Sequence, residues 1–290
     1  MKVTRPIVGV TGANGYLGSL LCEHLDKVGF EVIRLVRRPE PGTPDRPFVL
    51  GSEIEDGVLE NLDVVVHCAY DFATRSKAEL WETNVLGTRK LFAAANVAGV
   101  RRTIFLSSMS AYPGTRQVYG RAKLASEIDA RSFGFCSVRP GLVYGKRWGG
   151  TAGSLRKLAM LPVVPLVGAK TSLFCAHEDD LAEAIVDLAK RDSAPVVPLG
   201  LAHEAPVNFR DLFQGLAQDV TGKPARFLHI PWRLLLIGMR LGEALRVKLP
   251  LRADSLLGLM RPARQLPNEE TIRELGLHFR EFSLPLESNL

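Results

Sequence analysis

The sequence predicts an α/β fold in which helices cover both faces of a parallel sheet. Short apolar runs typical of buried strands occur at 7–11, 31–36, 63–68, 103–107 and 135–139. Helical patterns separate them, at 17–28, 78–98 and 119–132. This alternation favours parallel pairing through right-handed crossovers, and the Val, Ile and Leu content of the runs indicates strands that are buried on both faces.

Length, composition and charge narrow the class of protein. A chain of 290 residues with a hydrophobic fraction of 46% can bury the core of one large α/β domain or two small ones. The formal net charge is +6, but no basic run is interleaved with aromatic residues. We therefore expect no nucleic-acid partner, and an anionic small ligand fits the charge equally well.

The cysteines and histidines predict no metal site. Cys22, Cys68, Cys136 and Cys175 are far apart and have apolar neighbours, as is typical of reduced core thiols. The six histidines form no cluster with metal-ligand spacing. The N-terminus runs directly into a strand pattern without a signal-peptide core, and no apolar stretch is long enough to cross a bilayer. We expect a cytoplasmic protein.

A glycine-rich turn, TGANGYLGS, follows the first strand. Gly12 permits the tight turn, Gly15 lets a pyrophosphate approach the backbone, and Gly18 lets the following helix pack closely. In this strand–turn–helix context the motif predicts a Rossmann-type dinucleotide site. The residues expected to bind the cofactor here are Gly12, Asn14, Gly15, Tyr16, Leu17 and Gly18.

The chain divides into a core and a lobe. We expect residues 1–144 to form a doubly wound Rossmann-type core that also receives 178–200, where an amphipathic helix at 178–190 precedes a short apolar run. Residues 145–177 and 201–290 contain short helical patterns broken by Gly and Pro. These segments predict a small C-terminal substrate lobe.

The second strand ends in LVRRPE, where an acidic residue would bind the ribose diol of NAD. Arg37 and Arg38 instead suit a 2′-phosphate, which requires positive charge and several donors. The sequence therefore predicts NADP, with NAD as the alternative. The other interpretation is that both arginines are solvated loop charges.

Residues 104–127 supply a hydroxyl, a phenol and an amine in order. Ser107 and Ser108 end a strand, and Tyr119 and Lys123 lie one helical turn apart on the next helix. A tyrosine ordinarily titrates near pH 10, and a neighbouring ammonium lowers the pKa by stabilising the phenolate. We expect Tyr119 to be a general acid or base and Lys123 to modify its pKa.

Together these motifs resemble the short-chain dehydrogenase/reductase superfamily, above all its extended branch of NAD-dependent epimerases, dehydratases and reductases. The resemblance rests on TGANGYLG (11–18), DVVVHCAY (63–70), NVLGTRKLFAAA (84–95), FLSSMSAY (105–112), YGRAK (119–123), RPGLVYG (139–145) and CAHEDDLAEAI (175–185). It implies that Ser108 orients the reacting oxygen, with Ser107 as the alternative, and that Lys123 also contacts the nicotinamide ribose.

The resemblance implies further contacts. For the cofactor it implies Ala69, Tyr119, Lys123, Pro140, Gly141 and Val143. For the substrate it implies Tyr70, Asp71, Met109 and Arg147. It also implies a homodimer.

The resulting prediction is an NADP-dependent oxidoreductase that moves hydride to or from a carbonyl or secondary alcohol. A nucleotide-sugar epimerase or reductase is implied first, and an enzyme for a simpler ketone or aldehyde second. The loop from Ser108 to Tyr119 is shorter than in many sugar-nucleotide epimerases. The alternative is a non-catalytic dinucleotide-binding redox sensor or assembly protein, although such relatives usually lack the tyrosine or the lysine.

Residues 232–249, WRLLLIGMRLGEALRVKL, form an apolar helix punctuated by basic residues. Such a segment can lie on a membrane surface, form a dimer face or cap a substrate cleft. We expect a core or lid helix in preference to membrane contact.

Overall fold

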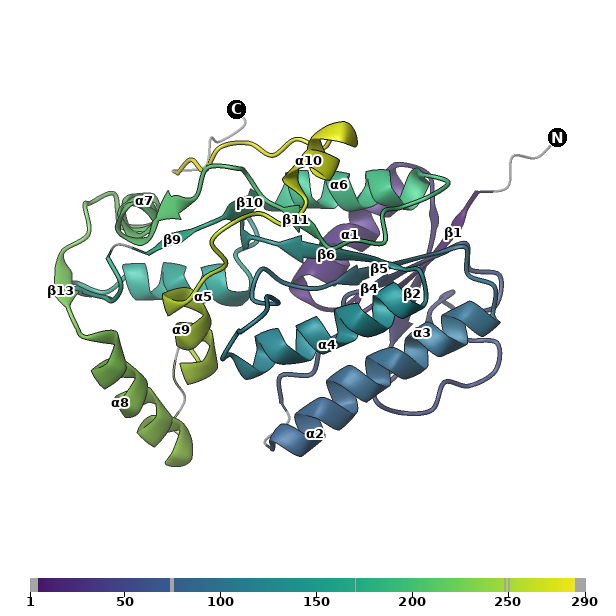
Figure 1. Ribbon diagram of the computed structural model, residues 1–290, viewed down its shortest axis with the longest axis horizontal. Coiled ribbons are helices and arrows are strands. Elements are labelled where there is room, and N and C mark those ends of the chain that lie inside the picture. The colour runs from purple at the N-terminus through teal and green to yellow at the C-terminus, as the bar shows by residue number, and fades with distance from the viewer. Residues whose placement is uncertain (1–4, 74–75, 170, 248, 250, 285–290) are drawn as a thin grey trace.

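The computed structural model describes every residue except 1–4, 74–75, 170, 248, 250 and 285–290, and it has the predicted α/β architecture (Figure 1). Seven strands form one parallel sheet. In spatial order they are β11 (Leu199–Leu201), β6 (Cys136–Pro140), β5 (Arg102–Leu106), β4 (Val64–His67), β1 (Ile7–Thr11), β2 (Glu31–Val36) and β3 (Arg46–Pro47). The order reverses between β1 and β4, which is where α/β sheets of this kind bind ligands.

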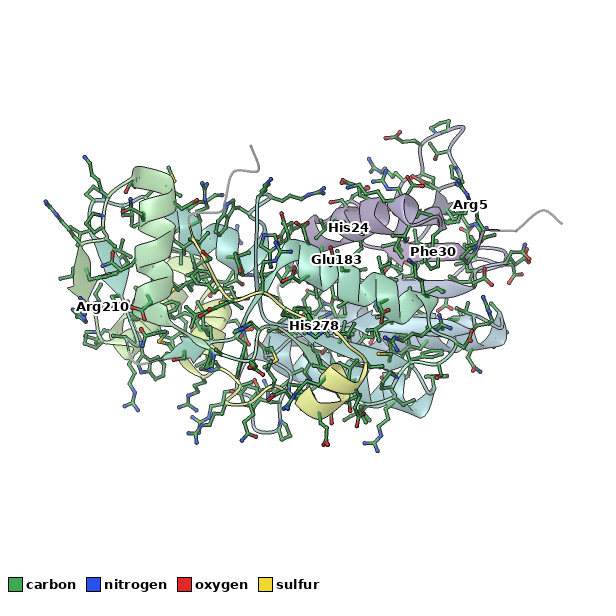
Figure 2. All side chains as sticks on the ribbon, turned by 90° about the horizontal axis from the view of Figure 1, so that it is seen from above. Arg5, His24, Phe30, Glu183, Arg210 and His278 are labelled. Carbon is green, nitrogen blue, oxygen red and sulfur yellow. The ribbon has the colours of Figure 1, made fainter. Side chains whose placement is uncertain are left out.

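Helices cover both faces of the sheet. On one face α1 (Tyr16–Lys27) lies beside α6 (Glu178–Lys190), and Figure 2 shows His24 and Glu183 on these neighbouring helices. Their apolar side chains share a buried cluster with the strands. On the other face α3 (Gly87–Val97) and α4 (Val118–Ser132) bury a second cluster that includes Leu91, Phe92 and Ala130.

The helix expected at 78–98 is interrupted by a π-helical turn. It consists of α2 (Lys77–Trp81), the π-turn η1 (Glu82–Leu86) and α3. A π-turn inserts one extra residue into a helix and is frequent at functional sites.

The C-terminal lobe has a core of its own. Its helices are α5 (Gly150–Ala159), α7 (Phe209–Thr221), α8 (Trp232–Ala244) and α9 (Ala253–Met260), and they share one buried cluster. Two-strand pairings join β7 (Leu142–Tyr144) to β10 (Cys175–His177), β9 (Ser172–Leu173) to β12 (Val207–Asn208), and β8 (Val164–Leu166) to β13 (Phe227–His229).

The chain returns to the Rossmann-type core near its end. Ile272, in α10 (Glu269–Glu274), and Leu277 pack into the cluster that holds α1 and α6. Part of the segment that the sequence analysis assigned to the lobe therefore packs on the Rossmann-type core. The domain boundaries themselves stay a prediction. None of the helices in the described part of the chain is both long and apolar enough to cross a membrane.

Candidate active site

The carboxyl ends of the central strands bring the expected site residues to one edge of the sheet. β1 ends at Thr11, β4 at His67 and β5 at Leu106. Tyr119 and Lys123 follow on the first turns of α4, which packs against this edge. Among the described residues no cluster of His, Cys, Asp and Glu has metal-binding geometry.

The glycine turn has the geometry that the sequence predicts. Gly12 has a φ of +66°, and a Cβ there would lie 2.9 Å from the Ala69 backbone. A Cβ at Gly18 would lie 2.1 Å from the Gly12 carbonyl oxygen, so the first turn of α1 sits directly on the glycine turn. No side chain of the described residues caps α1, and its first turn holds no acidic residue. These open N–H groups fit an anionic pyrophosphate.

A buried chain of hydrogen bonds links the carboxyl ends of β1 and β4 to α3. His67 is fully buried; its Nδ1 lies 2.7 Å from Thr11 Oγ1, and its Nε2 lies 2.9 Å from Thr88 Oγ1. Thr88 donates its proton to the Asn84 carbonyl, so it accepts from Nε2–H and His67 must accept the Thr11 proton at Nδ1. Burial lowers the pKa of His67 to about 3, which keeps the ring neutral.

The Thr11 hydroxyl also binds the backbone of the loop that follows β4. It accepts hydrogen bonds from the N–H groups of Cys68 and Ala69, each at 3.1 Å. Asn84, in the π-turn, accepts from the Asp71 N–H at 2.7 Å and donates to the Asp71 and Leu80 carbonyls. The loop after β4 is therefore held at Cys68, Ala69 and Asp71.

The surroundings of Tyr119 shift its pKa. Burial raises its pKa to about 12, and the neighbouring Ser108 side chain, which lowers the pKa, is outweighed. The Lys123 amine donates to the Leu106 carbonyl at 2.6 Å, and its Nζ lies 5.9 Å from the centre of the Tyr119 ring; its effect on the phenol stays a prediction. In this structure Tyr119 is a protonated phenol at neutral pH.

Lys123 is buried under aromatic rings. Its Nζ lies 4.6 Å from the ring centre of Phe105 and 5.2 Å from that of Tyr70. Burial lowers the pKa of Lys123 to about 8. The ammonium group of Lys123 thus loses its proton more easily than that of a free lysine. It also has N–H donors that the bond to the Leu106 carbonyl does not use.

The two serines at the end of β5 have different partners. Ser107 donates to the buried carboxylate of Glu127, which also accepts from Arg139 Nε at 2.7 Å. Ser108 adjoins Tyr119, and its hydroxyl accepts from the Ser110 N–H at 3.1 Å. The Ser107 hydroxyl is therefore occupied by a structural ion pair, which favours Ser108 as the oxygen-orienting residue.

Two aromatic rings lie against the Tyr119 phenol: the expected substrate residue Tyr70, and Phe72, which the sequence analysis missed. The Tyr70 ring meets Tyr119 edge-on at 4.8 Å, and Phe72 stacks on Tyr119 at 5.7 Å while remaining 54% exposed. Burial raises the pKa of Tyr70, and its hydroxyl is buried without a hydrogen-bond partner among the described residues. Tyr70 thus offers an unused polar group beside Tyr119.

A second missed residue comes from the lobe. Asp254, in the first turn of α9, accepts from the N–H groups of Val118 and Tyr119 at 2.9 and 3.1 Å. The carboxylate caps the first turn of α4 from 135 residues away. From the sequence, an acidic residue in the first turn of a helix indicates a local dipole partner only, so nothing nearby signals this contact.

Two further contacts dock α9 on the loop before Tyr119. The Tyr112 hydroxyl donates to the Arg261 carbonyl at 2.7 Å. A Cβ at Gly258 would lie 2.5 Å from the Gln117 side chain, so the helix approaches this loop closely. The C-terminal lobe therefore positions the helix that carries the phenol.

Positive side chains gather beyond the second strand. Arg37 and Arg38 directly follow β2, both are exposed, and neither has an ion-pair partner among the described residues. Arg34, on β2, donates to the Asn14 side chain in the glycine turn. Whether Arg37 and Arg38 bind a 2′-phosphate stays a prediction.

Two of the expected ligand-binding residues face protein partners. The Tyr16 hydroxyl donates to the buried Glu178 carboxylate at 2.8 Å, and its ring lies against Gly149. The Arg147 guanidinium is paired with Glu23 on α1 in a two-point contact whose longer bond measures 3.0 Å. Their roles toward cofactor and substrate stay predictions.

The remaining candidates line the edge near β6. Gly141 donates its N–H to the Leu201 carbonyl at 3.0 Å, and Val143 is buried in β7. Met109 is partly buried and donates its N–H to the Pro140 carbonyl at 3.3 Å. Met109 and Pro140 therefore lie side by side, and their roles toward substrate and cofactor stay predictions.

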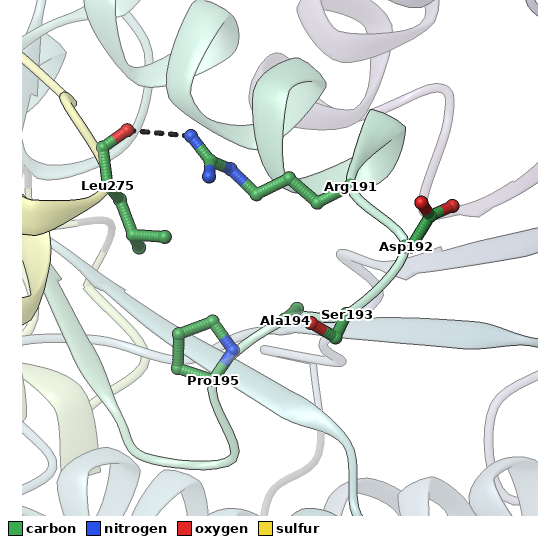
Figure 3. A pocket seen from close by; sticks show the side chains of 6 residues that line it. All are labelled: Arg191, Asp192, Ser193, Ala194, Pro195 and Leu275. Carbon is green, nitrogen blue, oxygen red and sulfur yellow. Dashed lines mark hydrogen bonds between the residues drawn. The ribbon is translucent and has the colours of Figure 1, made fainter.

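A hollow at the far end of α6 is separate from this site. It is lined by residues 191–195 and Leu275 (Figure 3). Arg191 donates to the Leu275 carbonyl and to Asp187, both at 2.6 Å, so its guanidinium is already paired. Because α6 begins at the carboxyl edge of the sheet and runs back, the hollow lies at the opposite edge from Tyr119.

Comparisons with known proteins agree with this arrangement. A family model described as the NAD dependent epimerase/dehydratase family matches residues 8–195. Ceramide reductase of Caulobacter vibrioides is 27% identical over 241 residues, which cover 78% of this chain and 74% of that protein. UDP-glucose 4-epimerase of Streptomyces lividans is 29% identical, with coverage of 69% and 71%.

A solved structure gives the same picture. MoeE5 in complex with UDP-glucose and NAD superposes with a TM-score of 0.63 at 25% identity, covering 77% of this chain and 85% of that one.

Proposed function

Since this chain belongs to the NAD-dependent epimerase/dehydratase family, and is thereby an NAD(P)-dependent oxidoreductase, we propose that it is an NADPH-dependent reductase of an apolar carbonyl compound. The observation that carries this proposal is the pair of aromatic rings, Tyr70 and Phe72, beside the Tyr119 phenol. A substrate at the phenol would contact these rings, which favour an apolar skeleton next to the reacting carbonyl.

Several residues support the cofactor part of the proposal. The uncapped first turn of α1 suits a pyrophosphate. Arg37 and Arg38 are exposed at the end of β2, where a 2′-phosphate distinguishes NADPH from NADH. We expect Arg37, directly after the strand, to contribute more than Arg38.

The protonation state of Tyr119 supports the reductive direction. Bound NADPH supplies the hydride, and the carbonyl oxygen then requires a proton. A phenol whose pKa is about 12 holds its proton at neutral pH and is suited to act as the acid. Ser108 orients the carbonyl oxygen, and Lys123 keeps positive charge within reach of the developing oxyanion.

The charge distribution disfavours a diphosphate substrate. Arg147 is paired with Glu23, and Arg156 is paired with Asp219 at 3.2 Å while stacking on Trp148. These guanidinium groups would have to break existing ion pairs to bind a phosphate. The relative named ceramide reductase, matched over most of both chains, agrees with an apolar substrate.

A nucleotide sugar is the second candidate. It is favoured by the likeness to MoeE5 solved with UDP-glucose and by the relative named UDP-glucose 4-epimerase. In this case the exposed Lys146 and a released Arg147 would bind the diphosphate.

Cofactor titration followed by turnover tests the proposal. The purified chain is titrated with NADPH and NADH, and NADPH oxidation is then followed with a long-chain keto lipid and with a UDP-4-keto-sugar. We expect preference for NADPH and turnover of the keto lipid. Turnover of the sugar alone would transfer the assignment to the second candidate. Binding of neither dinucleotide would overturn the cofactor assignment as well.

A further inference from the structure

Helix α8 has an apolar stripe that faces away from the protein. Leu234, Ile237, Leu241 and Leu245 follow one another at intervals of three and four residues and are 56–78% exposed. Such spacing places side chains on one face of a helix. The opposite face is the one that packs on the lobe, through Leu236 and Met239, which are 8% exposed. In Figure 1 the helix forms the outer end of the lobe.

Positive charge borders this stripe. Arg233 and Arg240 are exposed and project between the buried face and the apolar stripe. Neither has an ion-pair partner in the described residues, and Arg233 stacks on the ring of Trp232 at 5.7 Å. Glu243 is the one acidic residue of the helix, and its carboxylate accepts the Ala253 N–H at 2.8 Å. The outward side of α8 is thus apolar and cationic.

We infer that α8 docks this protein on the surface of an anionic lipid bilayer. An outward apolar stripe with an arginine border matches a helix that lies in the headgroup region. A second copy of the chain would bring the same arginines to the interface, because a two-fold contact pairs identical patches. Anionic headgroups neutralise these arginines instead.

The position of α8 connects the bilayer to the site. α8 packs on α9, and α9 holds the first turn of α4 through Asp254. Only α9 therefore separates a bilayer-bound α8 from α4, the helix that carries Tyr119. The docking needs no particular substrate, although it would serve a lipid substrate of the proposed function.

Vesicle co-sedimentation of the full chain tests the inference. The chain is mixed with vesicles of phosphatidylcholine alone and with vesicles of equimolar phosphatidylcholine and phosphatidylglycerol. We expect binding to the anionic vesicles only, weakened by added salt. The double variant Ile237→Glu, Leu241→Glu should lose this binding at least ten-fold, because it places charge in the outward apolar stripe that would enter the bilayer. Arg233→Gln and Arg240→Gln should each weaken binding about five-fold.

Val97→Glu is the matched control, because Val97 is an 87% exposed apolar residue on α3. It should bind vesicles as the wild type does. NADPH titration of every variant shows whether the cofactor half has folded, and it separates failure of the docking from failure of the proposed function.

Three results would overturn the inference. The first is that the wild type binds neither vesicle. The second is equal binding to both vesicles, which would remove the role of the arginines. The third is a dimer in sedimentation velocity that the double variant converts to a monomer without any vesicle binding, which would assign the stripe to a second copy.

Discussion

Two regions of the molecule use polar and apolar side chains in opposite ways. One is the sheet edge beside Tyr119, and the other is the pair of lobe helices α8 and α9. At the sheet edge, the chain from Thr11 through His67 to Thr88 pairs buried polar groups with one another. On α8, apolar groups are turned outward, and on α9 the polar Asp254 reaches into the other region. Buried pairing holds a geometry, whereas an outward stripe requires something to cover it.

The largest expected effect tests whether the sheet edge carries the chemistry. Tyr119→Phe removes the proton donor while keeping the ring that packs on Tyr70 and Phe72. Turnover of the keto lipid should fall about 1,000-fold, as is usual for loss of a general acid, and NADPH affinity should stay within a factor of about two. Initial rates and NADPH fluorescence titration measure the two quantities.

Tyr70→Phe is the control, because it removes a neighbouring phenol of the same cluster. If both variants lost activity equally, Tyr119 would not be the distinct proton donor of the site.

The next effect concerns the stability of the same region. The pKa of Lys123 is about 8 when folded, against 10.5 for a free side chain, so the unfolded chain binds more protons between these values. The free energy of unfolding should therefore rise with pH from about 8 to about 10.5. At pH 7 the buried ammonium costs about 3 kcal/mol. Lys123→Met should raise the stability at pH 7 by an amount of this order while abolishing turnover.

Denaturant unfolding at pH 7 and pH 10 measures this change. Lys190→Met, at an exposed lysine of α6, should leave the pH dependence intact. A less stable Lys123→Met at pH 7 would mean that the bond to the Leu106 carbonyl outweighs the cost of burial.

A smaller effect is expected at the cofactor end. Arg37→Glu reverses the charge where the 2′-phosphate is expected, and it should weaken NADPH binding about 10- to 100-fold with little change for NADH. Parallel titrations with both dinucleotides measure the ratio. Arg5→Glu, at another exposed arginine, is the control. An equal loss for both dinucleotides would indicate general charge attraction instead of phosphate recognition.

The smallest effect tests the link between the two regions. Asp254→Ala removes the acceptor for two N–H groups of α4 and should lower the free energy of unfolding by about 1 kcal/mol. Turnover should fall as well, because Tyr119 lies in the uncapped turn. Asp254→Asn keeps one oxygen acceptor, so its stability and turnover should lie between those of the wild type and Asp254→Ala.

Asp211→Ala is the control, because Asp211 is an exposed acid in the first turn of α7. Thermal unfolding and initial rates measure both effects. Unchanged turnover in Asp254→Ala would separate the lobe from the positioning of Tyr119.

Much of the core was predictable because its signals are local. The strands at 7–11 and 31–36 and the helix at 178–190 have the expected bounds, since apolar runs and acidic first turns are visible in a short window. The fold class is confirmed for the same reason. The glycine turn also has its expected shape, because its close contacts require glycine wherever they occur.

The features that the sequence did not predict depend on contacts between distant segments. The π-turn, the pairing of His67 and the small strand pairs of the lobe follow from neighbours that no local pattern identifies. The effect of Lys123 on Tyr119 stays a prediction, because burial also raises the pKa of the phenol. Desolvation depends on the whole surrounding structure, which spacing alone does not contain.

The π-turn at Glu82–Leu86 makes this site sensitive to deletion. The turn holds one residue more than an α-helix uses, and it leaves the Leu80 carbonyl free for the Asn84 side chain. Removing a single residue there would close a regular helix and rotate Lys77–Trp81 by about 100° relative to α3. The anchor of the loop at Asp71 would turn with it, so a loss of one codon, far from any reacting atom, would displace the rings that flank Tyr119.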